Sequence, residues 1–408
     1  MSHVIDSEQS DAEWRERAAA VLPGGASTGS KRPEALYGAG TEFGPSHYVS
    51  AQGCRLVTAA GAELVDCTMA LGAVALGYAD EAVTQAVIEA ATRGNVAGLS
   101  SVLEVEVAER LCEVIPCAER VRFLKSGAEG VNAAVRIART LTGRPLVIGC
   151  GYFGWLDWWS DARGVTAGAR ADFRAVPFDD PQALVDAVRA AGDALAAIVL
   201  EPVIERLPSE EWVRTARRLC DETGAVLVFD EMKTGFRLRT GGYQEYAGIT
   251  PDLAVFGKAL ANGYPLAAVV GRARVMDAAR DTWISSTLAG ETVALAAAGA
   301  VLEWHARGEV CEALWEAGEE MRSGVERAIA ASELDGVRVR GIPPMWLIDF
   351  DDDARRSRFL ELALEGGVLF KRGAYNFASA AHDEDAIARI ETAASAALVR
   401  LRDEVHVR

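Results

Sequence analysis

Short apolar runs alternate with amphipathic segments along most of the chain. The amphipathic segments have helical spacing, and the apolar runs are short and continuous, as in strands buried on both faces of a sheet. This alternation predicts an α/β fold, with a mostly parallel sheet covered by helices on both faces. The predicted helices are 11–22, 81–93, 102–114 and 128–141, and the predicted strands are 145–148, 196–200, 226–229, 253–256 and 266–270.

The two ends of the chain follow other patterns. Residues 26–45 are rich in Gly, Ser, Thr and Pro, which predicts an extended segment that wraps onto another surface. Beyond residue 290 an Ala-rich helix precedes strands at 337–340 and 345–349 and a final helix from 383, as in a smaller α+β domain. We therefore expect three parts: an N-terminal segment (1–64), a large domain (65–290) and a C-terminal small domain (291–408).

Composition places the chain among globular enzymes of the cytoplasm. The 408 residues are 50% hydrophobic and 25% charged, and no apolar span is long enough to cross a bilayer. The net charge of −17 opposes binding to nucleic acid or anionic membranes. The start of the chain lacks a secretory signal, and the seven scattered cysteines suit reduced thiols. The five histidines lie far apart, so we expect no metal site.

Two of the predicted buried strands end in a single charge. The run 226–229 is followed by Asp230, and the run 253–256 leads through Gly257 to Lys258. Either charge alone would more often be a helix cap or a solvated side chain. Together they lie where α/β sheets place ligands, at the carboxyl ends of neighbouring strands. Pyridoxal phosphate requires this pair, a lysine amine for its aldehyde and a carboxylate for its pyridinium nitrogen.

A small, glycine-containing turn opens the helix predicted at 128–141. Its residues Ser126, Gly127 and Ala128 leave backbone N–H groups free at the positive end of the helix dipole, which is an anion site without any basic side chain. The turn therefore suits a phosphate group. The alternative is that Ser126 only caps the helix.

A second glycine pattern, Gly149 to Gly154, matches the G-x-G-x-x-G dinucleotide fingerprint. That fingerprint needs a helix at its third glycine, whereas residues 155–164 are aromatic and poorly periodic. Tyr152 or Phe153 instead suits a ring that a loop offers to a flat cofactor. The alternative is an aromatic core cluster with the nearby tryptophans.

Six motifs, in their order and spacing, resemble the class III aminotransferases of the fold type I pyridoxal phosphate enzymes, most closely the branch around glutamate-1-semialdehyde aminomutase. The likeness runs from residue 23 to about residue 385. It implies a large domain with a mostly parallel, seven-stranded type of sheet flanked by helices, a smaller α+β domain from both termini, and a homodimer with shared active sites. The N-terminal segment 1–64 would be part of the small domain and of the dimer contacts. The motifs are Ser126–Gly130, Gly151–Gly154, Leu200–Val203, Phe229–Arg237, Phe256–Gly263 and Ser286–Gly290.

The resemblance assigns roles around a bound pyridoxal phosphate. Lys258 would form the internal aldimine and later move a proton between substrate and cofactor carbons, and Asp230 would hold the pyridinium proton. Tyr152 and Met232 would cover the two faces of the ring, and Glu201 would lie near its phenolic side. The phosphate would be bound by Ser126, Gly127 and Ala128, and by Thr287 of the partner subunit.

Several positions depart from the family pattern. Ala128 replaces a threonine, which removes a hydroxyl from the phosphate site, and Phe153 replaces a histidine beside the ring. Arg206 stands where the aminomutase has asparagine, and Lys31 where it has an arginine that binds a carboxylate. We take Lys31, Arg32, Arg206 and Arg237 as candidate binders of a substrate carboxylate, although each alone would more often be a surface or structural charge.

The sequence favours a pyridoxal phosphate aminotransferase that moves an amino group from a small amino donor to a carbonyl acceptor by a ping-pong mechanism. A 2,1-aminomutase of the glutamate-1-semialdehyde type and a decarboxylase or lyase on the same scaffold stay open as alternatives. A nicotinamide dehydrogenase built on residues 149–154 is the alternative from another class. The sequence does not identify the donor or the acceptor.

Overall fold

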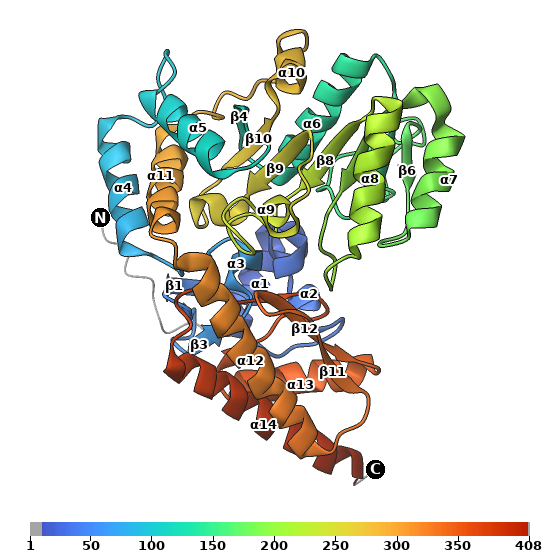
Figure 1. Cartoon of the computed structure of the whole chain (residues 1–408). Helices are drawn as coiled ribbons and strands as arrows, with labels where there is room; N and C mark the ends of the chain where they lie inside the picture. The colour runs from blue at the N-terminus through green and yellow to red at the C-terminus, as the bar shows by residue number, and fades with distance from the viewer. Residues whose placement is uncertain (1–9, 407–408) are drawn as a thin grey trace. The chain divides into compact units, whose positions relative to one another are not determined.

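The computed structural model describes residues 10–406, and the chain divides into two compact units (Figure 1). One unit combines the two ends of the chain, up to Asp80 and from Glu312, and the other is continuous from Glu81 to Cys311. Both boundaries between the units lie further along the chain than the boundaries expected after residues 64 and 290. The second break moves because α11 (Thr292–Ala306) packs against α4 (Glu81–Arg93) and α5 (Val102–Val114), so it belongs to the central unit.

The central unit contains a seven-stranded sheet of mostly parallel strands, which confirms the predicted α/β fold. β10 is the antiparallel member and pairs with β4 on one side and β9 on the other. The other neighbouring pairs are parallel, including β8 with β9. In spatial order the strands are β4 (Arg120–Leu124), β10 (Ala267–Gly271), β9 (Leu253–Gly257), β8 (Val226–Asp230), β7 (Leu195–Leu200), β5 (Leu146–Cys150) and β6 (Phe173–Ala175).

Helices pack on this sheet along most of its width (Figure 1). α6 (Gly127–Thr142) lies along β7, β9 and β10, while α7 (Pro181–Ala191) and α8 (Glu210–Thr223) pack together and contact β5, β7 and β8. The shorter helical segments are α9 (Tyr243–Ala247), α10 (Ala273–Met276), η3 (Gly192–Ala194), η4 (Lys258–Ala261) and η5 (Asp277–Arg280).

Alternate side chains of the central strands divide the sheet into two buried faces, as strand geometry requires. One face packs on α6 in a single apolar cluster that includes Val226 and Val228 of β8 and Val255 of β9. Asp230 continues the alternation of Val226 and Val228, so it lies on the face that α6 covers. The beginning of α6 and the carboxylate of Asp230 thus share one face of the sheet.

The unit formed by the two ends of the chain contains two small sheets. In the first, β13 from the C-terminal part pairs in parallel with β3 from the N-terminal part, which confirms an α+β unit built from both ends. The first sheet is β1 (Tyr48–Gln52), β2 (Arg55–Thr58), β3 (Glu63–Asp66) and β13 (Val368–Leu369), and the second is β11 (Val337–Ile342), β12 (Met345–Phe350) and β14 (Asn376–Phe377). The helical segments are α1 (Asp11–Val21), η1 (Pro23–Gly25), η2 (Gly29–Lys31), α2 (Pro33–Tyr37), α3 (Met69–Gly72), α12 (Val310–Ser332), α13 (Asp353–Glu365) and α14 (Glu384–His406).

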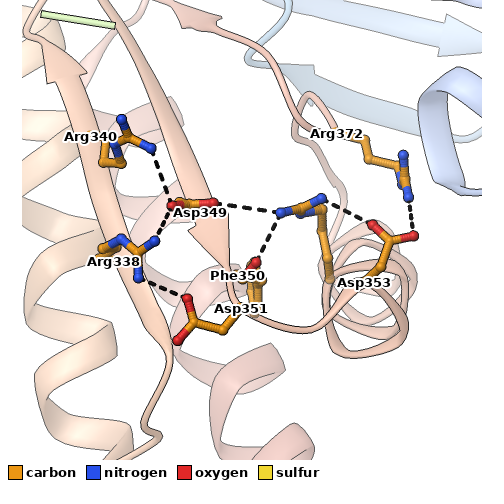
Figure 2. Close-up of polar contacts among 8 residues, drawn as sticks. Arg338, Arg340, Asp349, Phe350, Asp351, Asp353 and Arg372 are labelled. Atoms are coloured by element: carbon orange, nitrogen blue, oxygen red, sulfur yellow. Dashed lines mark hydrogen bonds and ion pairs between the residues drawn. The ribbon is translucent and has the colours of Figure 1, made fainter.

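A network of ion pairs fastens β11, β12 and the start of α13 (Figure 2). Asp349 of β12 accepts from Arg338 at 2.6 Å and Arg340 at 3.4 Å, both on β11. Arg372 bonds Asp353 in the first turn of α13. Exposed pairs of this kind each contribute at most about 1 kcal/mol. The network therefore orients these elements more than it stabilises them.

A buried lysine holds the N-terminal segment within the same unit. The ammonium of Lys371 donates to the carbonyl oxygens of Ser30 at 3.2 Å and Ala35 at 3.1 Å. Burial, helped by the positive charge of Arg372, lowers the pKa of Lys371 to about 8. These two bonds bracket Lys31 and Arg32 and fix the backbone that carries them.

Among the described residues, no helix is long and apolar enough to span a bilayer. The expected cytoplasmic location stays a prediction.

Candidate active site

Asp230 and Lys258 come from adjacent parallel strands and meet at the same edge of the central sheet. Asp230 is the last residue of β8 and is paired in register with Val255 of β9. Lys258 follows the last residue of β9 directly. Its backbone is in the left-handed region (φ 49°), which a non-glycine residue rarely adopts and which is common at functional sites. The predicted juxtaposition of amine and carboxylate follows from this topology.

The surroundings of Lys258 favour a neutral amine. Burial, helped by the ammonium of Lys233, lowers its pKa to about 8, although the carboxylates of Asp230 and Glu201 oppose the shift. A larger fraction of the amine is then neutral near pH 7 than for an ordinary lysine, and only the neutral amine is a nucleophile. Lys258 thus has the reactivity that attack on an aldehyde needs.

The carboxylate of Asp230 is buried and accepts the Met232 backbone N–H at 3.0 Å. Burial and the neighbouring Glu201 raise the pKa of its carboxyl to about 7, against the favourable charges of Lys258 and Lys233. A buried acid of this kind is stabilised in its ionised form by a cationic partner. The protonated nitrogen of a pyridinium ring is such a partner.

Glu201 lies at the end of β7 and is held from two sides. One oxygen contacts the Lys233 ammonium at 2.6 Å, and the other accepts the backbone N–H of Tyr152 at 3.1 Å. The side chains of Glu201 and Lys233 are only 11% and 12% exposed. The phenol ring of Tyr152, by contrast, is 65% exposed and is free to cover a ligand.

The beginning of α6 has the features of an anion site. Ser126 is the N-cap and forms a capping box with Glu129, which fixes the first turn. The box engages the N–H of Glu129, and the N–H of Gly130 bonds the Ser126 carbonyl. Gly127 and Ala128 lie in the first turn of α6, where the backbone N–H groups have no acceptor within the helix. Both are therefore available to bind a phosphate at the positive end of a 16-residue helix.

Close contacts explain the glycines that surround these side chains. A Cβ on Gly127 would lie 2.8 Å from the Met232 methyl, and one on Gly257 would lie 2.6 Å from it. A Cβ on Gly151 would lie 2.4 Å from the Cβ of Glu201. The glycines thus bring α6, β9 and the Tyr152 loop close to Met232 and Glu201, which leaves one compact site.

Gly154 gives a direct test of the phosphate site. Its φ is +85°, and a Cβ on it would lie 2.3 Å from the Cβ of Ala128, so Gly154→Ala must displace the first turn of α6. We expect this variant to weaken cofactor binding at least about tenfold, which corresponds to about 1.4 kcal/mol. The measurement is a titration of cofactor-stripped protein with pyridoxal phosphate.

The control for that variant is Gly164→Ala. Gly164 lies in the same loop with a φ of +101°, but a Cβ on it would meet nothing within 4 Å. It carries the same backbone strain without the collision, so it should retain most of the affinity. Equal losses in the two variants would show that strain in the loop, and not contact with Ala128, decides cofactor binding.

The prediction that Phe153 contacts the cofactor is wrong. Its ring is 1% exposed and packs inside the core, 5.7 Å from Trp158 in a stacked arrangement and edge-on to Trp159 and Phe173. An enclosed ring cannot stack on a cofactor, so only Tyr152 remains a candidate, and its role stays a prediction. The fingerprint at 149–154 also fails, because residues 151–172 contain no helix that could bind a dinucleotide.

Thr287 lies in an exposed loop between β10 and α11. The loop is tied to the phosphate site at its far end, because Glu291, the N-cap of α11, accepts from Lys125 at 2.8 Å. Lys125 directly precedes Ser126. The exposure of Thr287 is compatible with a contact to another subunit, and that role stays a prediction.

The four candidate anion binders differ in their surroundings. Lys31 and Arg32 are exposed in the unit of the two chain ends, and Arg237 is fully buried in the central unit, where burial lowers its pKa to about 10. Arg206 is exposed but already forms an ion pair with Asp179. Their roles in substrate binding stay predictions.

Sequence reasoning did not single out Lys233 or Glu231. Glu231 is fully buried and accepts the backbone N–H groups of Tyr243 at 2.8 Å and Gln244 at 3.0 Å, so it supports α9. Lys233 belongs to the site because it forms an ion pair with Glu201. The sequence did contain a signal for Lys233: it is a charged residue between Met232 and Thr234, inside a motif already assigned to the cofactor.

Comparison with known proteins decides the family. Residues 39–152 and 170–379 match the family model described as Aminotransferase class-III. The chain belongs to this family. The unmatched stretch between the two segments is the loop that begins at Phe153 and carries the tryptophans. The chain thus matches the family model on both sides of this loop, and residues 153–169 lie outside the match.

Relatives within the family are similar over nearly their whole length. The glutamate-1-semialdehyde 2,1-aminomutase of Sorangium cellulosum is 34% identical, with 94% of each chain covered. That of Methanothermobacter thermautotrophicus is 31% identical, with 95% of this chain and 98% of the relative covered.

Solved structures of pyridoxal phosphate enzymes share the fold. The FumI protein of Sphingopyxis sp. MTA144, in its PLP internal aldimine form, has a TM-score of 0.92 at 29% identity, with 97% of each chain covered. A transaminase with PLP bound has a TM-score of 0.88 at 27% identity, with 96% and 98% covered. The protein is therefore a class III enzyme of fold type I, and its cofactor is pyridoxal phosphate.

The site fits this cofactor on its own geometry. It offers an amine with a lowered pKa at Lys258, a buried acid at Asp230, an anion site at the start of α6, and an accessible ring at Tyr152. These match the aldehyde, the pyridinium nitrogen, the phosphate and the flat ring of pyridoxal phosphate.

Proposed function

We propose that this enzyme is an aminotransferase that moves an amino group between two separate small molecules, an amino donor and a carbonyl acceptor. The two half-reactions use one site, so donor and acceptor act in turn. Support comes from the family, from the lowered pKa of the Lys258 amine and from the neighbouring carboxylate of Asp230.

Each residue of the site has a separate task in this proposal. The bound cofactor supplies a ring that withdraws an electron pair from the substrate carbon. Asp230 would hold the proton on the ring nitrogen, and the N–H groups at the start of α6 would bind the phosphate. Lys258 would bind the cofactor covalently and, once displaced by the incoming amine, take a proton from one carbon and return it to the other.

Residue 206 carries the choice of reaction. Arg206 lies in the loop that leaves the carboxyl end of β7, and its guanidinium bonds Asp179 and lies 5.1 Å from the Phe178 ring centre. The aminomutase pattern has a neutral asparagine there. A fixed cation in this loop suits a donor or acceptor with its own carboxylate and departs from the aminomutase arrangement.

A 2,1-aminomutase is the second candidate, and the relatives named for that reaction favour it. Such an enzyme shifts an amino group within one substrate and needs no external donor. A decarboxylase or lyase is the third candidate and would release carbon dioxide or ammonia from one substrate without any carbonyl acceptor.

The test is a half-reaction screen on the purified holoenzyme. Single amino donors are added without an acceptor, and the visible absorption of the cofactor is followed together with the keto product. A transaminase loses the absorption and forms one equivalent of keto product per site. Isomerisation of glutamate-1-semialdehyde without any donor, combined with no bleaching by other amines, would favour the aminomutase instead.

We also propose that the enzyme is a homodimer in which Thr287 completes the phosphate site of the partner subunit. A cluster of apolar side chains is exposed on the central unit beside the Thr287 loop and lines a hollow of about 1290 Å³ together with that loop. Such a patch is typical of a protein interface. Its exposed members are Val96, Leu99 and Val102.

Leu99→Glu tests the dimer, since Leu99 is 87% exposed and a charge there would be buried by a partner. We expect monomers in sedimentation analysis at micromolar concentration and at least about tenfold weaker cofactor binding. Leu141→Glu, at a side chain 45% exposed near the end of α6 and outside this hollow, is the control and should leave the dimer intact. A Leu99→Glu protein that remains dimeric with full cofactor affinity would contradict the proposal.

A further inference from the structure

Lys233 and Glu201 form an enclosed ion pair at the carboxyl edge of the central sheet. Their charged atoms are 2.6 Å apart, and both side chains are about nine-tenths buried. Lys233 lies three residues after Asp230, and Glu201 directly follows the neighbouring strand β7. Two charges removed from water in this way cost more than a surface pair, so their retention calls for a role at this position.

Both charges of the pair act on the reactive amine. The charged groups that act on Lys258 are the cations Lys233 and Arg237 and the carboxylates Asp230 and Glu201. Lys233 is the strongest of the four and opposes a positive charge on Lys258, whereas Glu201 favours it. The two members of the pair therefore act on the amine with opposite signs.

The same pair also fixes the backbone of the Tyr152 loop. The second oxygen of Glu201 accepts the Tyr152 N–H at 3.1 Å, and Gly151 contacts the Cβ of Glu201 closely enough to exclude any side chain there. Lys233 thereby orients the carboxylate of Glu201. Glu201 in turn holds the backbone of Tyr152, the residue expected to cover the cofactor ring.

We propose that Lys233 is a positioning residue of the active site, which holds Glu201 against the Tyr152 backbone and places a second positive charge beside Lys258. The proposal rests on the cofactor and on the position of Lys258, and it is independent of whether the enzyme transfers or isomerises amino groups. Lys233 itself is not expected to bond with substrate.

The proposal predicts shifts of opposite sign for two substitutions. Lys233→Met removes the cation and leaves the carboxylate, so the nitrogen that joins Lys258 to the cofactor should hold its proton to a pH about one unit higher. Glu201→Gln removes the carboxylate and leaves the cation, so the same proton should be lost about one unit lower. Lys233→Arg keeps the charge and should restore the wild-type midpoint.

The experiment is a pH titration of the visible absorption of the holoenzyme, without substrate, for wild type and the three variants. The rate at which pyridoxal phosphate reattaches to the cofactor-stripped protein is followed over the same pH range, because only the neutral amine of Lys258 reacts. The double variant Lys233→Met with Glu201→Gln should return both midpoints close to wild type. Hydrogen exchange at the Tyr152 amide should rise in Lys233→Met and not in Lys233→Arg.

A matched control breaks a similar ion pair at the opposite end of β9, the strand that Lys258 follows. Asp252 precedes β9, and its carboxylate bonds Arg217 at 2.8 Å, with side chains 3% and 18% exposed. The strand separates Asp252 from Lys258 by roughly 20 Å. Arg217→Met should lower the melting temperature and leave both midpoints unchanged.

Midpoints that move in the same direction in Lys233→Met and Glu201→Gln, or that do not move in either measurement, would overturn the proposal. If Lys233→Met does not fold, the comparison of Glu201→Gln with Lys233→Arg carries the test, since only the first should shift the midpoints. None of these measurements uses a substrate, so a failed half-reaction screen would leave the result standing.

Discussion

Lys258→Ala will reduce turnover by about 10⁴-fold or more while the protein still binds pyridoxal phosphate noncovalently. The variant loses both the covalent bond to the cofactor and the base that moves the proton, and positioned acid–base catalysis alone contributes about 10²–10⁴-fold. The phosphate site at the start of α6 and the carboxylate of Asp230 remain in place. Initial rates with an active donor and acceptor, together with equilibrium dialysis of the cofactor, measure the two effects.

An added small amine distinguishes this loss from misfolding. A primary amine in solution can take over the proton transfer if the cavity left by Lys258 is otherwise intact, so methylamine should recover part of the activity in proportion to its concentration. Turnover within tenfold of wild type in Lys258→Ala, without added amine, would show that another residue performs the chemistry.

Asp230→Asn will be the next most damaging substitution, with turnover lower by about 10³-fold. The amide has nearly the same shape but no negative charge, so the ring nitrogen loses the partner that keeps it protonated and the ring becomes a weaker electron acceptor. The Met232 N–H can still bond the amide oxygen, which preserves the local backbone. Single-turnover rates of cofactor amination measure the effect directly.

The adjacent acid provides the control. Glu231 is as buried as Asp230, but its carboxylate accepts from the Thr234 hydroxyl and from the backbone at the start of α9. Glu231→Gln should therefore lower the melting temperature and leave the visible spectrum of the bound cofactor unchanged. A similar loss of amination rate in both variants would mean that the Asp230 effect is structural.

The sequence specified the elements that carry the site because each of them is a short apolar run followed at once by an isolated charge. The strands β8 and β9 were expected within one residue of their observed ends, and their parallel pairing brings Asp230 and Lys258 to one edge. The start of α6 was equally accessible, because a serine followed by small residues and a glutamate is a capping pattern. At these positions the local sequence pattern and the strand order both predict the observed site.

Contacts between segments that are distant in the chain could not be predicted from the sequence in this way. Nothing near Lys233 in the chain indicates that its partner is Glu201, because the two meet only once β7 and β8 are paired. Phe153 was assigned to the cofactor because it adjoins Tyr152, yet the two rings point into different environments, one enclosed by Trp158 and one exposed. Side-chain direction in an irregular loop depends on the packing of the whole unit.

The boundary between the units also depended on long-range packing. The Ala-rich segment after residue 290 was expected to begin the small domain because the apolar pattern changes there. Its helix, α11, instead completes the central unit by packing on α4 and α5. A change of pattern marks a new element, and only tertiary contact decides the unit to which it belongs.

Reductive trapping tests the covalent role of Lys258 most directly. Borohydride treatment of the holoenzyme, followed by proteolysis and mass spectrometry, fixes the cofactor to whichever lysine holds it. The account predicts one modified position, Lys258. Modification of Lys233, Lys125, Lys31 or Lys371 in its place, or a holoenzyme with no trapped cofactor, would contradict it.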